Sequence, residues 1–84
     1  MSVMIKVKVF ITLKKGILDP QGETVAKALK ALGFEEVQKV RVGKYIVLEL
    51  DGRKNEVVQR VEAMCQRLLA NPVIEDYSFE IESE

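Results

Sequence analysis

Hydrophobic and polar side chains alternate along the N-terminal part of this sequence. The odd positions hold Val3, Ile5, Val7, Val9, Ile11 and Leu13. The even positions include Lys6, Lys8 and Thr12. A period of two is typical of a strand with one buried face. The sequence therefore predicts a strand over Val3–Lys14.

A helical period follows a short connection. The apolar positions Val25, Leu29 and Leu32 recur with the spacing of one helix face. Asp19 is suited to cap the helix, and Pro20 is suited to its first position, where a missing N–H costs nothing. Gly33 is the expected stop. This pattern predicts a helix of about three and a half turns whose apolar stripe faces the core.

Alternation returns from about Val37. Val40 and Val42 face one way, and after Gly43-Lys44 an inner row consists of Ile46, Leu48 and Leu50. Two strands joined by a turn are predicted. A two-residue turn would pair Val42 with Tyr45 and mismatch the inner rows, so we favour a three-residue or bulged turn that pairs Val42 with Ile46.

A second helix is predicted from about Arg53 to Ala70. Its apolar stripe comprises Val57, Val61, Met64, Cys65, Leu68 and Leu69. Asn71-Pro72 ends it, because proline cannot continue a helix. Tyr77, Phe79 and Ile81 then alternate with polar residues in a final strand.

The predicted order is β-α-β-β-α-β, in one domain spanning residues 1–84. The natural arrangement is an α+β, ferredoxin-like fold with both helices on one face of a four-stranded antiparallel sheet. The first and third strands would be central. The last strand would then pair with the first and place Glu80 and Glu82 near Lys6 and Lys8. Lys39 and Arg41 would lie beside the strand that carries Glu49.

The opposite face of this sheet would be left without a helix. It is expected to carry Met4, Phe10, Tyr45 and Val47. Exposed apolar surface of this kind usually marks an interface. We therefore expect these four residues to mediate self-association of the chain into a homo-oligomer.

Composition narrows the possible functions. The 84 residues hold 13 Lys+Arg and 13 Asp+Glu, no histidine and one cysteine. Zero net charge gives no electrostatic footprint for nucleic acid or an anionic membrane. No apolar run approaches the roughly 20 residues that span a bilayer. A single thiol fits a reducing compartment, so a cytoplasmic module is expected.

The residues that could carry catalysis have simpler structural explanations. Cys65 lies on an apolar stripe with no histidine to activate it, so we interpret it as a buried thiol. Asp51 and Glu49 could suggest a catalytic carboxylate pair, but we interpret them as solvated residues at the end of a strand. The glycine-containing loops match no phosphate-binding motif. RNA binding would need more stacked aromatics and positive charge. An acylphosphatase-like activity would need a phosphate-cradling loop after the first strand. No catalytic residue and no metal site are predicted.

A set of polar residues in loops and at strand ends remains. It comprises Asp19, Gln21, Gly22, Arg41, Gly43 and Lys44. Binding residues concentrate at such positions. The structural alternative is that Asp19-Pro20 only caps a helix and Gly43 only forms a turn. The residues alone do not decide between these interpretations.

Three segments resemble the PurS family. They are Leu18–Gly22, Val40–Lys44 and Met64–Tyr77, in order and with matching spacing. The similarity runs from about Val7 to Tyr77, nearly the whole chain. The family's Asp-Pro-Gln-Gly motif falls on Asp19, Pro20, Gln21 and Gly22, and its Arg-x-Gly-Lys motif on Arg41, Gly43 and Lys44.

The resemblance implies the small subunit of phosphoribosylformylglycinamidine synthase, a ligase of purine biosynthesis also called formylglycinamide ribonucleotide amidotransferase. In that family a glutaminase subunit releases ammonia, and a synthetase subunit holds ATP and magnesium. The small subunit bridges the two and supports ammonia transfer. It carries no cofactor or catalytic site of its own and forms dimers or tetramers. The two motifs are then expected to bind the partner subunits.

An alternative of another class is a regulatory module of ACT type, which shares the topology. Such a module would bind a small amino acid at a dimer interface near the loop after the first strand. Stabilisation by amino acids would identify it, because a ligand raises stability in proportion to RT ln(1 + [L]/Kd).

Overall fold

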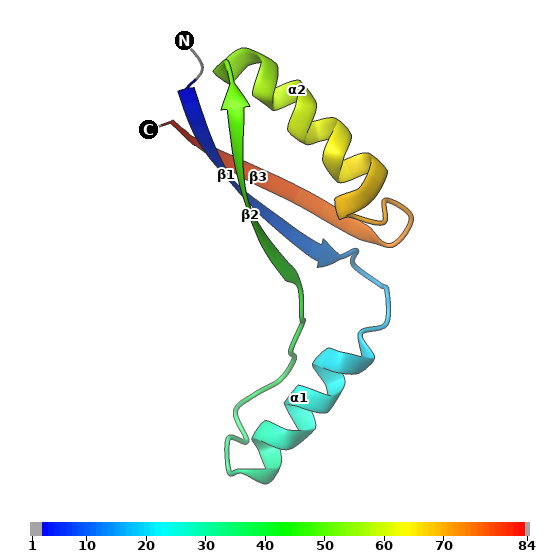
Figure 1. The fold of residues 1–84 in the computed structure, drawn as a ribbon. Coiled ribbons are helices and arrows are strands. Elements are labelled where there is room, and N and C mark those ends of the chain that lie inside the picture. The colour runs from blue at the N-terminus through cyan, green and yellow to red at the C-terminus, as the bar shows by residue number, and fades with distance from the viewer. Residues whose placement is uncertain (1–2, 84) are drawn as a thin grey trace.

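Three antiparallel strands and two helices make up the chain (Figure 1). The structure is a computed structural model that describes residues 3–83. The strands are β1 (Val3–Leu13), β2 (Lys44–Gly52) and β3 (Glu75–Ser83). The helices are α1 (Pro20–Ala31) and α2 (Lys54–Met64), which continues into a π-helical turn, η1 (Cys65–Leu69). The predicted α+β class and both predicted helices are confirmed.

The sheet has the order β2-β1-β3, so the first strand is central, as predicted. The predicted third strand, β2, lies at an edge, so its predicted central position is wrong. Its inward side chains are almost completely buried: Ile5, Val7, Val9 and Ile11. Val57, Val61 and Cys65 of the second helix cover them. Val3 belongs to the strand, but its side chain lies outside the described part of the chain. The core is one helix packed on one face of a three-stranded sheet.

Opposite charges meet across β1 and β3, as predicted. Lys6 pairs with Glu82 and Lys8 with Glu80 in the backbone register. The Lys8 ammonium also forms an ion pair of 2.8 Å with the Glu82 carboxylate. The hydrogen bond and charge of this pair raise the pKa of Lys8 and lower the pKa of Glu82. The pair is solvent-accessible, so it supports register more than stability.

The strand predicted over 37–42 is wrong, and with it the four-stranded ferredoxin-like sheet. Residues 37–43 form no strand, and β2 begins only at Lys44. The three-residue or bulged turn predicted at Gly43-Lys44 is therefore absent, and so is the pairing of Lys39 and Arg41 with the strand that carries Glu49. Other hydrogen bonds replace those of a strand pair here. The Val42 N–H donates to the Asp19 carboxylate, and the Arg41 guanidinium donates to the carbonyls of Ile17 and Lys14 in the connection after β1.

The prediction that both helices cover one face is also wrong. Only α2 lies on the sheet, and α1 projects away from it on two extended connections (Figure 1). The radius of gyration is 16.6 Å, against about 12 Å for a compact chain of this length. The apolar stripe of α1 is consequently not part of the core: Val25 and Leu32 are exposed.

The predicted ends of α1 are confirmed. Asp19 caps it by accepting the Gly22 N–H, and Pro20 is its first residue. Gly33 follows with φ of +102°, a left-handed conformation that suits glycine after a helix. Within residues 3–83, neither helix combines the length and the apolar character that crossing a membrane requires.

Candidate functional site

The residues predicted to bind partners lie together at the N-terminal end of α1. Asp19–Gly22 begin the helix, and Arg41–Lys44 lie on the returning connection just before and at the start of β2. The two motifs are more than twenty residues apart in sequence, yet hydrogen bonds join them directly. We call the residues Asp19–Gly22 and Arg41–Lys44, with the carbonyls they bind, the hinge.

Asp19 is the centre of the hinge. Its Oδ1 accepts the Gly22 N–H at 2.8 Å, and its Oδ2 accepts the Val42 N–H at 2.8 Å. Only 6% of the residue is exposed. The Val42 bond, the Gly22 bond and the nearby Arg41 charge lower the pKa of the Asp19 carboxyl. One carboxylate thus caps α1 and also binds the connection that leads into β2, so the capping alternative is true but incomplete.

Arg41 joins the hinge from the other side. Its Nη1 donates to the Ile17 carbonyl at 2.8 Å, and its Nη2 donates to the Lys14 carbonyl at 3.0 Å. A guanidinium is a planar fork of donors, so it can bind two backbone oxygens at once, which a lysine cannot do in the same geometry. Arg41 therefore holds the outgoing connection against the returning one.

Two glycines let these connections approach closely. A Cβ at Gly22 would overlap the Val40 carbonyl oxygen, and a Cβ at Gly43 would lie 2.5 Å from the Ile11 carbonyl oxygen. Neither position has a left-handed φ. The requirement for glycine here is therefore close backbone approach rather than a turn conformation, which corrects the interpretation of Gly43 as a turn residue.

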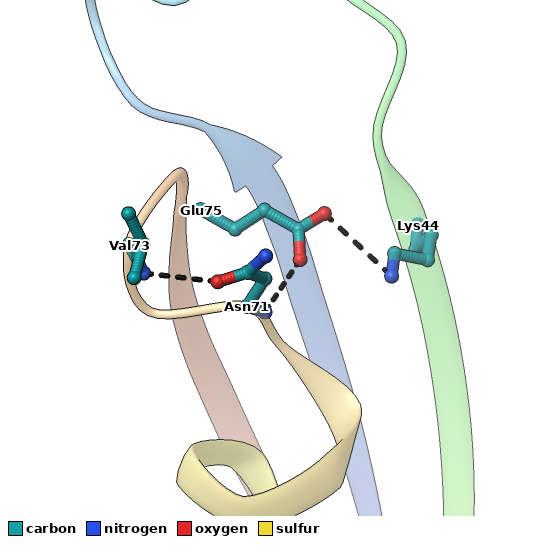
Figure 2. Close-up of polar contacts among 4 residues, drawn as sticks. All are labelled: Lys44, Asn71, Val73 and Glu75. Atoms are coloured by element: carbon teal, nitrogen blue, oxygen red, sulfur yellow. Dashed lines mark hydrogen bonds and ion pairs between the residues drawn. The ribbon is translucent and has the colours of Figure 1, made fainter.

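Lys44 reaches a second turn that the sequence analysis did not assign to the site. Its Nζ lies 3.6 Å from Glu75 Oε2 (Figure 2). Glu75 Oε1 accepts the Asn71 N–H at 2.7 Å, and Asn71 Oδ1 accepts the Val73 N–H at 3.1 Å. Asn71 and Glu75 fall in the third segment that resembles the family, which was the available signal, although no role was attached to them.

The hinge is bordered by two open cavities of about 400 Å³ each. One includes Glu23, Gln38 and Arg41, and the other includes Gln21, Lys44 and Glu75. Both contain Leu18, which is 68% exposed. Pro20 and Gln21 are exposed beside it. This combination of exposed apolar and polar groups on a hydrogen-bonded frame suits binding to another protein.

Two side chains of residues 3–83 that could take part in catalysis, Asp19 and Cys65, are hydrogen-bonded or buried. Both oxygens of Asp19 are occupied by backbone donors. Cys65 is completely buried, and burial raises the pKa of its thiol, which disfavours the reactive thiolate. The described residues contain no group of three or more potential metal ligands.

The residues expected to mediate self-association all lie on the outer face of the sheet. Met4, Phe10, Tyr45 and Val47 are all exposed there. Phe10 and Tyr45 are directly paired across β1 and β2, and their rings stack with centroids 5.3 Å apart. Val47 is the next residue of β2 on this face, so Phe10, Tyr45 and Val47 are neighbours, whereas Met4 lies further along β1, opposite Asp51 and beyond the charged pair Lys6 and Glu49.

Comparison with known proteins assigns the chain to a family. Residues 6–83 match the PurS family, described as phosphoribosylformylglycinamidine (FGAM) synthase. The PurS subunit of phosphoribosylformylglycinamidine synthase from Bacillus subtilis is 48% identical over 79 residues, which cover 94% of each chain. The corresponding subunit from Methanocaldococcus jannaschii is 48% identical over 80 residues, covering 94% of this chain and 96% of that one.

Solved structures agree in fold. The crystal structure of PurS from M. jannaschii, one of the subunits of formylglycinamide ribonucleotide amidotransferase in the purine biosynthetic pathway, superposes with a TM-score of 0.86 at 44% identity. It covers 95% of this chain and 98% of that chain. A chain in the structure of PurLQS from Thermotoga maritima matches with a TM-score of 0.82 at 32% identity, covering 96% of this chain and 98% of that chain.

Proposed function

The chain belongs to the PurS family, a subunit of phosphoribosylformylglycinamidine synthase, and from this premise we propose that it bridges the other subunits of that ligase. The synthase is an enzyme of purine biosynthesis, and this chain is its small component. The partners are a glutaminase subunit and a synthetase subunit, as the PurLQS assembly of Thermotoga maritima supports. The whole chain, residues 1–84, acts as one PurS-like domain in the cytoplasm.

In this proposal the chain itself is not catalytic. ATP and magnesium bind the synthetase subunit, and no cofactor, nucleic acid or membrane binds this chain. The chain supports the transfer of ammonia from glutamine during conversion of formylglycinamide ribonucleotide to formylglycinamidine ribonucleotide. This division of labour accounts for a chain without histidine whose cysteine is buried.

The observation that carries the proposal is the hinge. Two motifs far apart in sequence are joined by Asp19 and Arg41 into one frame. Around it lie the side chains of Leu18, Gln21 and Lys44, with open cavities between them. Such a frame is pre-organised, so a partner can bind it without an additional ordering cost. We assign docking of a partner subunit to Asp19, Pro20, Gln21, Gly22, Arg41, Gly43 and Lys44.

The outer face of the sheet supplies a second contact. Met4, Phe10, Tyr45 and Val47 are exposed apolar side chains on this face, and lysines and glutamates of opposite sign lie among them. We propose that these four residues contribute to association between copies of the chain. Bridging subunits are then present in at least two copies per assembly.

Reconstitution of the three subunits tests the docking assignment. The variants Arg41→Ala and Lys44→Ala are each combined with the glutaminase and synthetase, and glutamine-dependent synthesis is compared with ammonia-dependent synthesis. Loss of one docking contact is expected to weaken assembly by about tenfold, the equivalent of about 1.4 kcal/mol. Ammonia-dependent synthesis by the synthetase is expected to change much less.

The matched control is Arg53→Ala. Arg53 is an exposed cation at the start of α2, at the opposite end of β2 from the hinge. It is expected to leave assembly and both rates unchanged. Wild-type assembly and glutamine-dependent rates in both hinge variants would refute the assignment of this loop.

A further inference from the structure

The turn over Asn71–Glu75 is hydrogen-bonded throughout. The N–H groups of Ile74 and Glu75 donate to the Asn71 carbonyl. The Asn71 N–H donates to the Glu75 carboxylate, and the Val73 N–H donates to the Asn71 side chain (Figure 2). Pro72 has no N–H, so every backbone donor of the segment has an acceptor. The turn is therefore pre-organised by its own residues.

Two contacts join this turn to the hinge. The Ile74 carbonyl accepts the Lys14 N–H at 2.8 Å, and the Lys14 carbonyl accepts Arg41 Nη2 at 3.0 Å. Separately, Lys44 Nζ lies 3.6 Å from Glu75 Oε2 (Figure 2). The turn and the hinge thus form one frame, although they come from distant parts of the sequence.

An open cavity of about 400 Å³ lies between the hinge and the turn. Leu18 and Gln21 line it from the hinge side, and Ile74 and Glu75 line it from the turn. Its apolar walls are incompletely covered within the chain, because Leu18 is 68% exposed and Ile74 is 36% exposed. Filling the cavity with an apolar group would remove this surface from water, which is favourable.

The polar groups of the cavity indicate what kind of group fills it. The two carboxylates that line it, Asp19 and Glu75, already accept backbone N–H groups. A free amino acid needs an uncommitted carboxylate for its ammonium group, because small polar ligands are held by convergent polar groups. What the cavity offers instead is apolar surface beside the Lys44 ammonium, whose side chain is 55% exposed. This combination suits an apolar side chain of another protein with an oxygen acceptor beside it.

From these observations we propose that the partner subunit that binds the hinge also inserts an apolar side chain between Leu18 and Ile74. Lys44 donates to an oxygen acceptor on the same subunit, since an ammonium has three N–H donors and Glu75 occupies only one side of it. Glu75, whose side chain is 14% exposed, acts through Lys44 and the turn and is a positioning residue. The inference rests on the proposed function, in which a subunit of the synthase docks at the hinge, and extends that surface to the turn.

Alkylation of an introduced thiol tests the contact directly. Cys65 is completely buried, so Leu18→Cys offers iodoacetamide one accessible thiol among the described residues. The alkylation rate is compared between the chain alone and the chain assembled with the glutaminase and synthetase in the presence of glutamine and ADP. Assembly is expected to slow it by about tenfold, because only an accessible thiolate reacts.

The matched control is Val58→Cys. Val58 is 43% exposed and lies near the start of α2, at the far end of the sheet from the turn (Figure 1). Its alkylation rate is expected to stay the same on assembly.

Substitution of the cavity wall tests whether the contact contributes to binding. Leu18→Asn keeps the size of the side chain but removes its apolar surface, and it is expected to weaken assembly by about tenfold. Val58→Asn is the matched control and is expected to assemble like the wild type. Both original side chains are exposed, so both variants should keep the fold, which circular dichroism verifies.

A double-variant cycle tests the positioning role of Glu75. Glu75→Gln keeps an acceptor for the Asn71 N–H but removes the charge that holds Lys44, and it is expected to weaken assembly by about threefold. Glu82→Gln, which removes the ion pair with Lys8, is the control and should have no effect. In a Lys44→Ala background the effect of Glu75→Gln should vanish, whereas general destabilisation would persist.

Three results would overturn the inference: an alkylation rate of Leu18→Cys that assembly leaves unchanged, wild-type assembly of Leu18→Asn, or an effect of Glu75→Gln that persists without Lys44. If Arg41→Ala still weakens assembly in those cases, docking at the hinge stands and only the cavity contact is refuted. Wild-type assembly of Arg41→Ala together with protection of Leu18→Cys would refute docking at the hinge and support the cavity contact. Failure of the inference and failure of the proposed function are therefore distinguishable.

Discussion

The carboxylate of Asp19 accepts the backbone N–H of Val42 at 2.8 Å, across 23 residues of sequence. The same side chain caps α1 through Gly22. Asp19 therefore contributes both to the direction of the helix and to the path of the chain into β2. The hinge can be tested without knowledge of the partner subunits.

Substitution Asp19→Asn is expected to lower the Tm by about 5 °C, because the amide keeps the size of the carboxylate but supplies only one acceptor oxygen for two donors. Thermal unfolding followed by circular dichroism measures the change. Unchanged unfolding would show that the two backbone bonds contribute nothing to stability.

The pH dependence of stability provides an independent check on Asp19. Its pKa in the folded protein is lowered from an ordinary value of 3.8 by the bonds from Val42 and Gly22. The contribution is therefore fully present above about pH 4 and is lost as the pH falls through the lower folded pKa. Wild-type protein should lose more stability than Asp19→Asn between pH 5 and about pH 2 in urea titrations.

Substitution Arg41→Lys is expected to destabilise the hinge by about 1 kcal/mol, because an ammonium cannot replace both guanidinium bonds to Ile17 and Lys14. Hydrogen exchange should show faster exchange of the amides around Lys14–Leu18. The control Lys39→Arg changes an exposed neighbouring cation and should leave the exchange rates as they are. Equal protection in all three proteins would contradict the role of Arg41.

For Gly22→Ala, helix propensity and the structure predict changes of opposite sign in the free energy of unfolding. Helix propensity alone favours the alanine by about 1 kcal/mol. The structure predicts the opposite, a loss of about 2 kcal/mol, because the added methyl overlaps the Val40 carbonyl oxygen. Chemical denaturation decides between them. Gly16→Ala is the comparison: its φ of +91° carries a cost of about 1 kcal/mol, but no atom lies near the new methyl.

Val61→Ala is expected to remove about 2 kcal/mol from the free energy of unfolding, because Val61 is completely buried between α2 and β1. Val58 lies about one helical turn before Val61 in α2 and is 43% exposed, so Val58→Ala should lower the free energy of unfolding by well under 1 kcal/mol. Urea denaturation of the pair measures the difference. Similar losses in both variants would mean that α2 is not packed as described.

Local patterns in the sequence correctly predicted the structural features that depend only on residues close together in the chain. Alternation located the central strand, and its charges located the pairing of Lys8 with the β3 glutamates. Asp19, Pro20 and Gly33 marked the ends of α1. Period and capping depend on side chains a few residues apart, so they are readable without knowledge of the fold.

The same patterns misidentified residues 37–43 and the location of α1. Val40 and Val42 alternate like a strand, but the donor that a strand would need at Val42 is taken by Asp19. The stripe of α1 looks like a core face, but the hinge directs it outward. The hydrophobic pattern indicates which side chains favour burial, but it does not indicate which surface they pack against.

The sequence by itself determined the class of the chain, the limits of its helices, the buried row of β1 and the motifs that mark its family. Only the tertiary structure decided that the sheet has three strands, that the motifs meet at the hinge and that α1 leaves the sheet. The physical reason is the range of the interactions. Helix capping and hydrophobic periodicity depend on residues within one or two turns of each other. The hydrogen bond between Asp19 and Val42 joins residues 23 positions apart, so it depends on the tertiary fold.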